Sequence, residues 1–203
     1  MNTNDMEIEA KFYLHQLQSL EQRLVEAGAE LVQPRTHETN LRFDLVDGSL
    51  ARNRQVLRLR QDANNVVTFK GPAQMGATVA IRQEIEVNVS DFDAMRRILE
   101  ALGYRVVVMY EKWRTTYRMG DLEIVLDEMP YGYFCEIEAL NPAAIQAVME
   151  PLDLDWEARI SDSYLGLFDR FKANTGLQAA DLSFSAFAGV KVRPKDLGVR
   201  FAD

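Results

Sequence analysis

The chain has 203 residues, of which 47% are hydrophobic and 27% charged, as in an ordinary globular protein with one sizeable core. Its net charge of −8 argues against nonspecific binding of nucleic acid or of a membrane surface, because their phosphate groups would repel it at long range. No apolar run reaches the roughly 20 residues that span a bilayer, the first residues lack signal-peptide features, and the one cysteine, Cys135, cannot form an internal disulfide, so we expect a cytoplasmic location.

Strands dominate the predicted elements of the first half of the chain. Glu7–Phe12 alternates charged and apolar residues, which is the period of a half-buried strand. A helix follows over Leu17–Ala27 and ends at Gly28. Three further strand-like runs, separated by turn residues, are predicted at Thr39–Asp44, Val56–Arg60 and Val66–Lys70.

The second half repeats this pattern. Ala80–Val89 alternates again, and Ser90 with Asp93 is expected to cap a helix over Phe92–Leu102. Later elements are strands at Trp113–Met119, Asp121–Leu126 and Tyr133–Leu140, a helix that begins at Pro142, and a last helix from about Tyr164 to Lys172. Seven or eight alternating strands with short turns favour a barrel or a sandwich.

Two segments of different character are predicted. Residues 1–172 carry the periodic elements and are expected to form one domain. Residues 173–203 contain apolar residues without clear period, and the segment could dock on the barrel or bind a partner.

Charged side chains are sorted by strand and by face. Residues two apart on a strand share a face, so Arg58 and Arg60 lie together, with Leu57 and Leu59 behind them. Such faces could simply be solvated, as in most antiparallel sheets. Like charges on neighbouring positions repel one another, however, which favours a barrel whose charged faces turn inward.

An inward charged face would form a polar tunnel. Arginine and lysine side chains match phosphate oxygens, and carboxylates with bound phosphate are typical ligands of Mg²⁺ or Mn²⁺. No P-loop or dinucleotide motif is present, and neither His15 nor His37 has the spacing of metal ligands. Cys135 lies between Phe134 and Glu136, on the apolar side of its strand, and is expected to be a buried, inert thiol.

Six motifs follow one another along the chain. They are Glu7-x-Glu9-x-Lys11, Leu57-Arg58-Leu59-Arg60, Thr68-Phe69-Lys70-Gly71-Pro72, Arg82-x-Glu84-x-Glu86, Lys112-x-Arg114, and Leu126-Asp127-Glu128 with Gly132-x-Phe134-x-Glu136-x-Glu138. Over roughly residues 6–170 this series resembles the CYTH superfamily, or triphosphate tunnel metalloenzymes. That superfamily contains class IV adenylyl cyclases, thiamine triphosphatases and inorganic triphosphatases.

The resemblance implies an α+β fold, an eight-stranded antiparallel β-barrel or tunnel with flanking helices. It implies Mg²⁺ or Mn²⁺ as cofactor, with metal ligands at Glu7, Glu9 and Glu138, and next at Glu136 and Asp127. The substrate-binding residues would be Lys11, Arg58, Arg60, Lys70, Arg82, Lys112 and Arg114. Lys11, Arg58 and Glu136 are the expected catalytic residues, while Glu84 and Glu86 would orient the basic side chains.

We therefore expect a metal-dependent triphosphate phosphohydrolase that acts on an inorganic or organic triphosphate. The alternatives are an adenylyl cyclase that converts ATP to cyclic AMP and pyrophosphate, and a noncatalytic polyphosphate-binding module. Two departures weaken the cyclase alternative: Arg42 stands where family members often carry an aromatic residue, and residues 48–54 replace the aspartate-phenylalanine stretch of many cyclase-like members. The expected partner is a small triphosphate, with no nucleic acid and no membrane, and a homodimer is possible.

Overall fold

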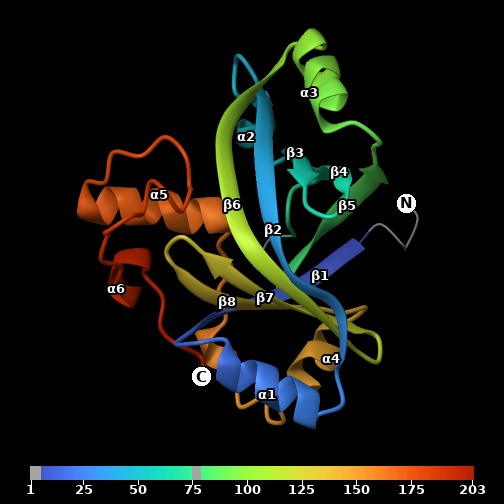
Figure 1. Ribbon diagram of the computed structural model, residues 1–203, viewed down its shortest axis with the longest axis vertical. Coiled ribbons are helices and arrows are strands. Elements are labelled where there is room, and N and C mark those ends of the chain that lie inside the picture. Colours follow the sequence, from blue (N-terminus) through green and yellow to red (C-terminus); the bar gives the residue numbers. More distant parts are fainter. Residues whose placement is uncertain (1–5, 75–78) are drawn as a thin grey trace.

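Eight antiparallel strands close into a barrel in a computed structural model that describes residues 6–74 and 79–203 (Figure 1). The predicted tunnel fold is thereby confirmed. The side chain of Glu7 lies outside the described part. The strands are β1 (Met6–Leu14), β2 (Glu30–Leu45), β3 (Val56–Gln61), β4 (Asn65–Lys70), β5 (Ala80–Asn88), β6 (Tyr104–Met119), β7 (Leu122–Met129) and β8 (Gly132–Glu138).

Helices lie in the connections and after the last strand. Gly28 follows the first helix with φ +82°, a conformation that glycine adopts without strain. The N-cap of α3 is Asp91, whose carboxylate accepts a hydrogen bond from Ala94 N–H, so the expected cap at Ser90 was one residue early. The helices are α1 (Gln18–Glu26), α2 (Ser49–Arg52), α3 (Phe92–Ala101), α4 (Pro142–Ala147), the short 3₁₀ helix η2 (Trp156–Ala158), α5 (Tyr164–Thr175) and α6 (Pro194–Leu197).

The strand order around the barrel is β1-β5-β4-β3-β2-β6-β7-β8, and β8 pairs with β1 to complete the circle. β2 and β6 are 16 residues each and run side by side along the whole molecule (Figure 1). Both are longer than the predicted strands, because their pairing continues through register shifts between Leu31 and Gln33, between Gln33 and Thr36, and at Arg42/Phe43.

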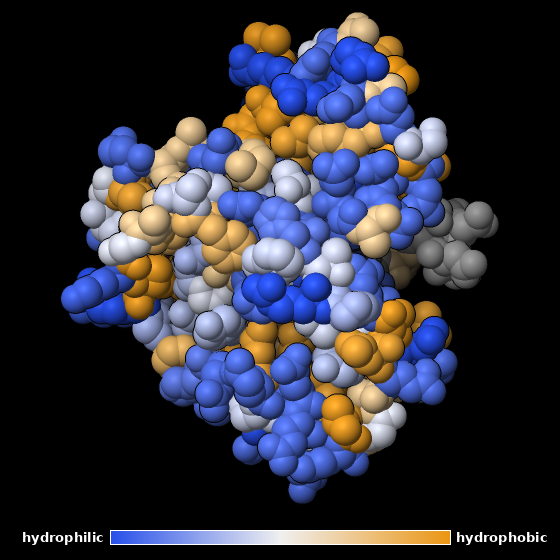
Figure 2. Space-filling view, in the orientation of Figure 1, coloured by the Kyte–Doolittle hydropathy of each residue, from blue (hydrophilic) through white to orange (hydrophobic). Residues whose placement is uncertain are grey.

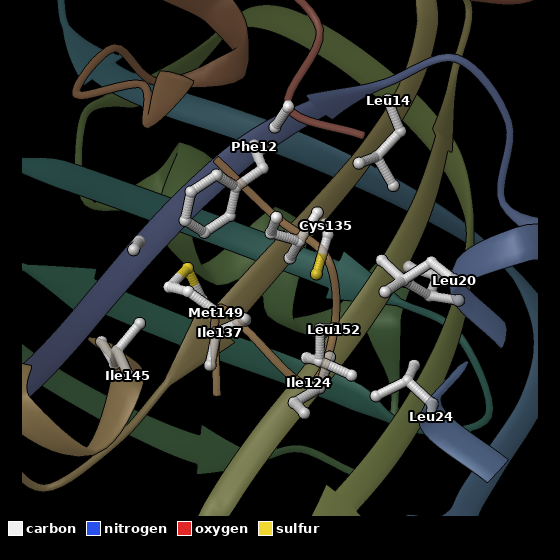
Figure 3. Packing of buried hydrophobic residues seen from close by; sticks show 14 of the residues in the cluster. Phe12, Leu14, Leu20, Leu24, Ile124, Cys135, Ile137, Ile145, Met149 and Leu152 are labelled. Atoms are coloured by element: carbon white, nitrogen blue, oxygen red, sulfur yellow. The ribbon is translucent and has the colours of Figure 1, made fainter. Parts of the chain in front are cut away.

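Apolar side chains on the outer faces of the strands pack beneath helices. On β1 and β8, Phe12, Cys135 and Ile137 face outward and join Leu20 of α1 and Ile145 of α4 in one cluster (Figure 3). Cys135 is fully buried, as expected. A second cluster places the outward leucines of β3 beneath α3. The apolar residues of the alternating pattern thus lie outside the barrel, which leaves its interior to the charged ones.

The C-terminal segment packs against the end of the barrel where β1 ends and β8 begins. Leu182, Phe187 and Leu197 are buried in one cluster with Tyr131 and Phe134. Backbone bridges join Tyr13 to Phe201 and Tyr110 to Leu182. Residues 173–203 thus dock on the barrel, which is one of the two roles considered for them from the sequence.

Most of the visible face of the molecule is hydrophilic, with an apolar area near the end that carries α3 (Figure 2). Ile98, Leu102 and Val107 are among the exposed large apolar residues of this region. Within the described residues, no helix combines the length and the apolar character needed to cross a membrane.

Candidate active site

A cavity of about 810 Å³ is lined by side chains from all eight strands and from the start of α5. Strand alternation explains its polarity: Arg58 and Arg60 of β3 line the cavity, whereas Leu57 and Leu59 pack beneath α3. The faces of like charge therefore turn into the barrel rather than toward solvent. The lining includes every basic residue expected to bind the substrate, namely Lys11, Arg58, Arg60, Lys70, Arg82, Lys112 and Arg114.

Carboxylates from three neighbouring strands meet at one mouth of this cavity. Glu9 of β1 pairs in register with Glu138 of β8, and Glu138 pairs in turn with Glu123 of β7. All three line the cavity. The carboxylate of Glu9 lies 3.9 Å from the Lys11 ammonium and 3.8 Å from the Arg82 guanidinium. Glu7 lies two residues earlier in β1, where only its backbone is described.

The chemistry of these donors suits a divalent metal. Carboxylate oxygens are the ligands that Mg²⁺ and Mn²⁺ prefer, and carboxylates placed directly opposite each other repel unless a cation lies between them. In the described part of the chain, no three acidic, histidine or cysteine side chains come close enough to enclose an ion. Mg²⁺ usually binds one or two protein carboxylates together with substrate phosphates and water. Glu9 and Glu138 supply such a pair, and their role as ligands stays a prediction.

Asp127 lies deeper in the barrel, fully buried, and is held by three side chains. Its carboxylate accepts a hydrogen bond from the Lys112 ammonium at 3.0 Å and two from the Arg114 guanidinium at 2.7 and 2.6 Å. The Tyr164 hydroxyl donates a further bond at 2.7 Å. This surrounding favours a role in fixing the two basic side chains over the metal ligation expected for Asp127.

Glu136 has a similar environment. Its carboxylate lies 3.1 Å from the Lys11 ammonium and 2.7 Å from the Arg114 guanidinium. Burial alone would raise the pKa of Glu136, but the positive charges of Lys11, Arg114 and Lys112 outweigh it and hold this pKa well below its usual range. Glu136 is therefore an ionised anchor for two basic side chains.

Acidic residues of β5 orient the basic residues of β3 and β4, as expected. The Lys70 ammonium lies 3.0 Å from the Glu84 carboxylate, and the Arg58 guanidinium lies 3.3 Å from that of Glu86. Arg58 also donates to the hydroxyl of Thr68 at 3.1 Å. These contacts tie each basic side chain to a neighbouring strand of the barrel.

Several residues of the cavity or its wall were not singled out from the sequence. Glu38 is 1% exposed, and its carboxylate lies 3.6 Å from the Lys112 ammonium. Burial would raise the pKa of Glu38, but Lys112 and Arg114 lower it to about 2. The signal that could have revealed Glu38 and Arg42 is their period-two spacing with Asn40 on one strand. Tyr110 and Glu123 carry the same period-two signal, because Tyr110 lies two residues before Lys112 and Glu123 lies four residues before Asp127. Tyr164 gave no such signal, because it lies on a helix far from the strands in the sequence.

The fold and the cavity place this chain in the class of closed antiparallel barrels with a charged interior. Residues 5–158 match the CYTH domain, and the chain belongs to this family. A Methanocaldococcus jannaschii protein that carries a provisional adenylate cyclase name is 30% identical over 135 residues, which are 66% of this chain and 76% of that protein.

Solved structures share the fold. A Vibrio parahaemolyticus protein, also provisionally named an adenylate cyclase, matches with a TM-score of 0.72 at 20% identity and covers 81% of this chain and 98% of its own. A Hippeastrum protein, also provisionally named an adenylyl cyclase but with a dominant triphosphatase activity, matches with a TM-score of 0.50 at 22% identity, over 96% of this chain and 100% of its own.

Proposed function

We propose that this chain is a metal-dependent phosphohydrolase of inorganic or organic triphosphates. The proposal rests on one observation: seven predicted phosphate-binding side chains line the same cavity as the carboxylates of Glu9 and Glu138. A triphosphate has about four negative charges and several oxygens, and basic side chains from several strands could hold it along its length.

The chain's own residues would act mainly by position and charge. Lys11 and Arg58 would contact phosphoryl oxygens and stabilise the charge that develops on them, which is the largest contribution in phosphoryl transfer. Glu136 was expected to act directly. Because Lys11 and Arg114 hold its carboxylate, we assign it instead to keeping those two side chains in place.

Mg²⁺ or Mn²⁺ at the acidic mouth would neutralise charge on the phosphate oxygens. Glu9 and Glu138 would hold it, together with Glu7 from the same strand as Glu9. A carboxylate at this mouth would orient the water that attacks the terminal phosphorus. The dominant triphosphatase activity described for the Hippeastrum protein agrees with hydrolysis as the main reaction of such a tunnel.

Product identity tests the proposal. The purified chain is incubated with tripolyphosphate, thiamine triphosphate or ATP, each with Mg²⁺ or Mn²⁺, and the products are resolved by ³¹P NMR. A hydrolase releases orthophosphate from at least one substrate, because water attacks the terminal phosphorus. Stoichiometric pyrophosphate with cyclic AMP would identify a cyclase instead, and shifted substrate resonances without any product would identify a binding module.

A further inference from the structure

Arg42 is a basic residue of the cavity that the predicted set does not include. It lies on β2, lines the cavity and is half-buried. Its Nε atom is buried and has no hydrogen-bond partner in the part of the chain that the structure describes. Over the same described residues, no ion pair joins Arg42 to an acidic side chain. The described protein groups therefore supply neither a hydrogen-bond acceptor for this Nε–H nor an ion-pair partner for this guanidinium.

The neighbours of Arg42 increase this imbalance. Arg42 lies directly opposite Arg58 in the register of β2 and β3, and like charges in such a pair repel. Burial lowers the pKa of Arg42, and the positive charges of Arg58 and Arg82 lower it further, whereas Tyr110 and Asp44 offset only part of this decrease. Three guanidinium groups from three strands therefore lie within electrostatic reach of one another.

The nearby acidic groups are already engaged. The Arg58 guanidinium lies 3.3 Å from the Glu86 carboxylate, and that of Arg82 lies 3.8 Å from the Glu9 carboxylate. Asp44 is two residues from Arg42, but its carboxylate accepts hydrogen bonds from the backbone N–H groups of Leu45, Leu50 and Ala51 around the start of α2. Asp44 therefore acts on Arg42 only at a distance, and among the described residues none of these carboxylates forms an ion pair with it.

The backbone beside Arg42 is irregular. In the pairing of β2 with β6, Arg42 is opposite Val108 and Phe43 is opposite Val106, so Val107 forms a bulge next to Arg42. Bulges of this kind bend a strand locally and change the direction of side chains near a site.

A purely structural arginine would more commonly carry its alkyl stem to the surface and place its charge in water.

We propose that Arg42 is a specificity-determining residue that forms, with Arg58 and Arg82, a subsite for a phosphate group. This subsite would favour a linear inorganic polyphosphate, charged along its whole length, over a nucleoside triphosphate. A nucleobase stacked on Arg42 would leave its charge and its Nε atom without a counter-group, whereas a phosphate oxygen satisfies both. The inference rests on the proposed binding of triphosphates in the tunnel.

Calorimetric titration of tripolyphosphate into the protein in EDTA tests the subsite, because binding is then measured without turnover. Arg42→Gln should bind tripolyphosphate about ten- to a hundred-fold more weakly, as for loss of one charged hydrogen bond. The matched control is Arg97→Gln on the exposed side of α3, which removes the same charge and should stay within about twofold of wild type. With ATP as titrant, Arg42→Gln should lose affinity by about tenfold less than with tripolyphosphate.

Thermal unfolding without ligand separates this role from a structural one. Arg42→Gln should have a melting temperature equal to or above that of wild type, because it removes an incompletely compensated charge. A clear decrease, or unchanged affinity for tripolyphosphate in Arg42→Gln, would overturn the inference. Arg42→Lys, which keeps the charge without the planar fork, should bind tripolyphosphate with an affinity between those of wild type and Arg42→Gln. Absence of tripolyphosphate binding by wild type in both EDTA and Mg²⁺ would overturn the proposed function itself.

Discussion

Carboxylates in the barrel occupy two environments, and these suggest two roles. Asp127, Glu136 and Glu38 are bonded to basic side chains inside the barrel. Glu9 and Glu138 lie opposite each other at the mouth. Period-two spacing could predict which face of its strand each carboxylate occupies. It could not predict which carboxylates contact basic side chains, because those basic side chains come from strands far apart in the sequence.

Replacement of Glu9 by glutamine tests whether the mouth of the cavity binds a metal ion. Glu9→Gln keeps the size of the side chain but removes a charged oxygen ligand, so we expect metal-dependent hydrolysis to fall by at least about a hundred-fold while the fold is kept. Orthophosphate release is measured across a Mg²⁺ and a Mn²⁺ titration, with circular dichroism as a check of folding. Glu150→Gln, on an exposed position, is the control. Near-normal activity of Glu9→Gln would show that Glu9 is not a ligand.

The buried carboxylate of Glu38 predicts a specific pH dependence of stability. Its pKa in the folded protein is about 2, below its ordinary value of 4.5, so its contribution is fully present above about pH 4.5 and is lost as the pH falls toward 2. This shift corresponds to about 3 kcal/mol. Urea unfolding should therefore show wild type more stable than Glu38→Gln at pH 7, by a margin that shrinks between pH 4.5 and pH 2.

The control for this experiment is Glu26→Gln on the exposed surface of α1. Its free energy of unfolding relative to wild type should change little over the same pH range. A margin between wild type and Glu38→Gln that stays constant from pH 7 to pH 2 would show that the carboxylate of Glu38 is not held by Lys112 and Arg114.

Individual strands and helices were predictable where the sequence alternates strictly or carries a strong stop signal. β3, β4 and β5 begin and end within one or two residues of their predicted bounds. β2 was found only in part, because Pro34 and the irregular register around it break the alternation. The docking of the last segment was not predictable, since its contacts join residues such as Tyr13 and Phe201 from opposite ends of the chain.

The last segment should contribute to the stability of the barrel. Leu182 is fully buried against aromatic residues of the strands, so Leu182→Ala should lower the free energy of unfolding by about 2–5 kcal/mol. Leu140→Ala, at a position 80% exposed, should cost less than about 0.5 kcal/mol. Urea unfolding followed by circular dichroism measures both. Equal, small effects would show that residues 173–203 fold separately from the barrel.

At the level of the whole molecule, the charge of the cavity is opposite to that of the chain. The described lining holds nine basic and six acidic side chains, whereas the full chain carries a net charge of −8. Basic groups buried in a barrel interact strongly with anions, because solvent screens them little. A protein that is acidic overall can therefore still select a small polyanion, and the same overall charge disfavours nucleic acid.

Crystals grown with tripolyphosphate and Mn²⁺ would test this account most directly, because the anomalous scattering of manganese locates the ion without assumption. We expect a manganese peak between Glu9 and Glu138, with phosphate density that extends from Lys11 and Arg114 toward Arg58 and Arg82. Manganese or phosphate bound only on the outer surface of the barrel, with the cavity filled by water, would contradict the assignment of this tunnel as a triphosphate site.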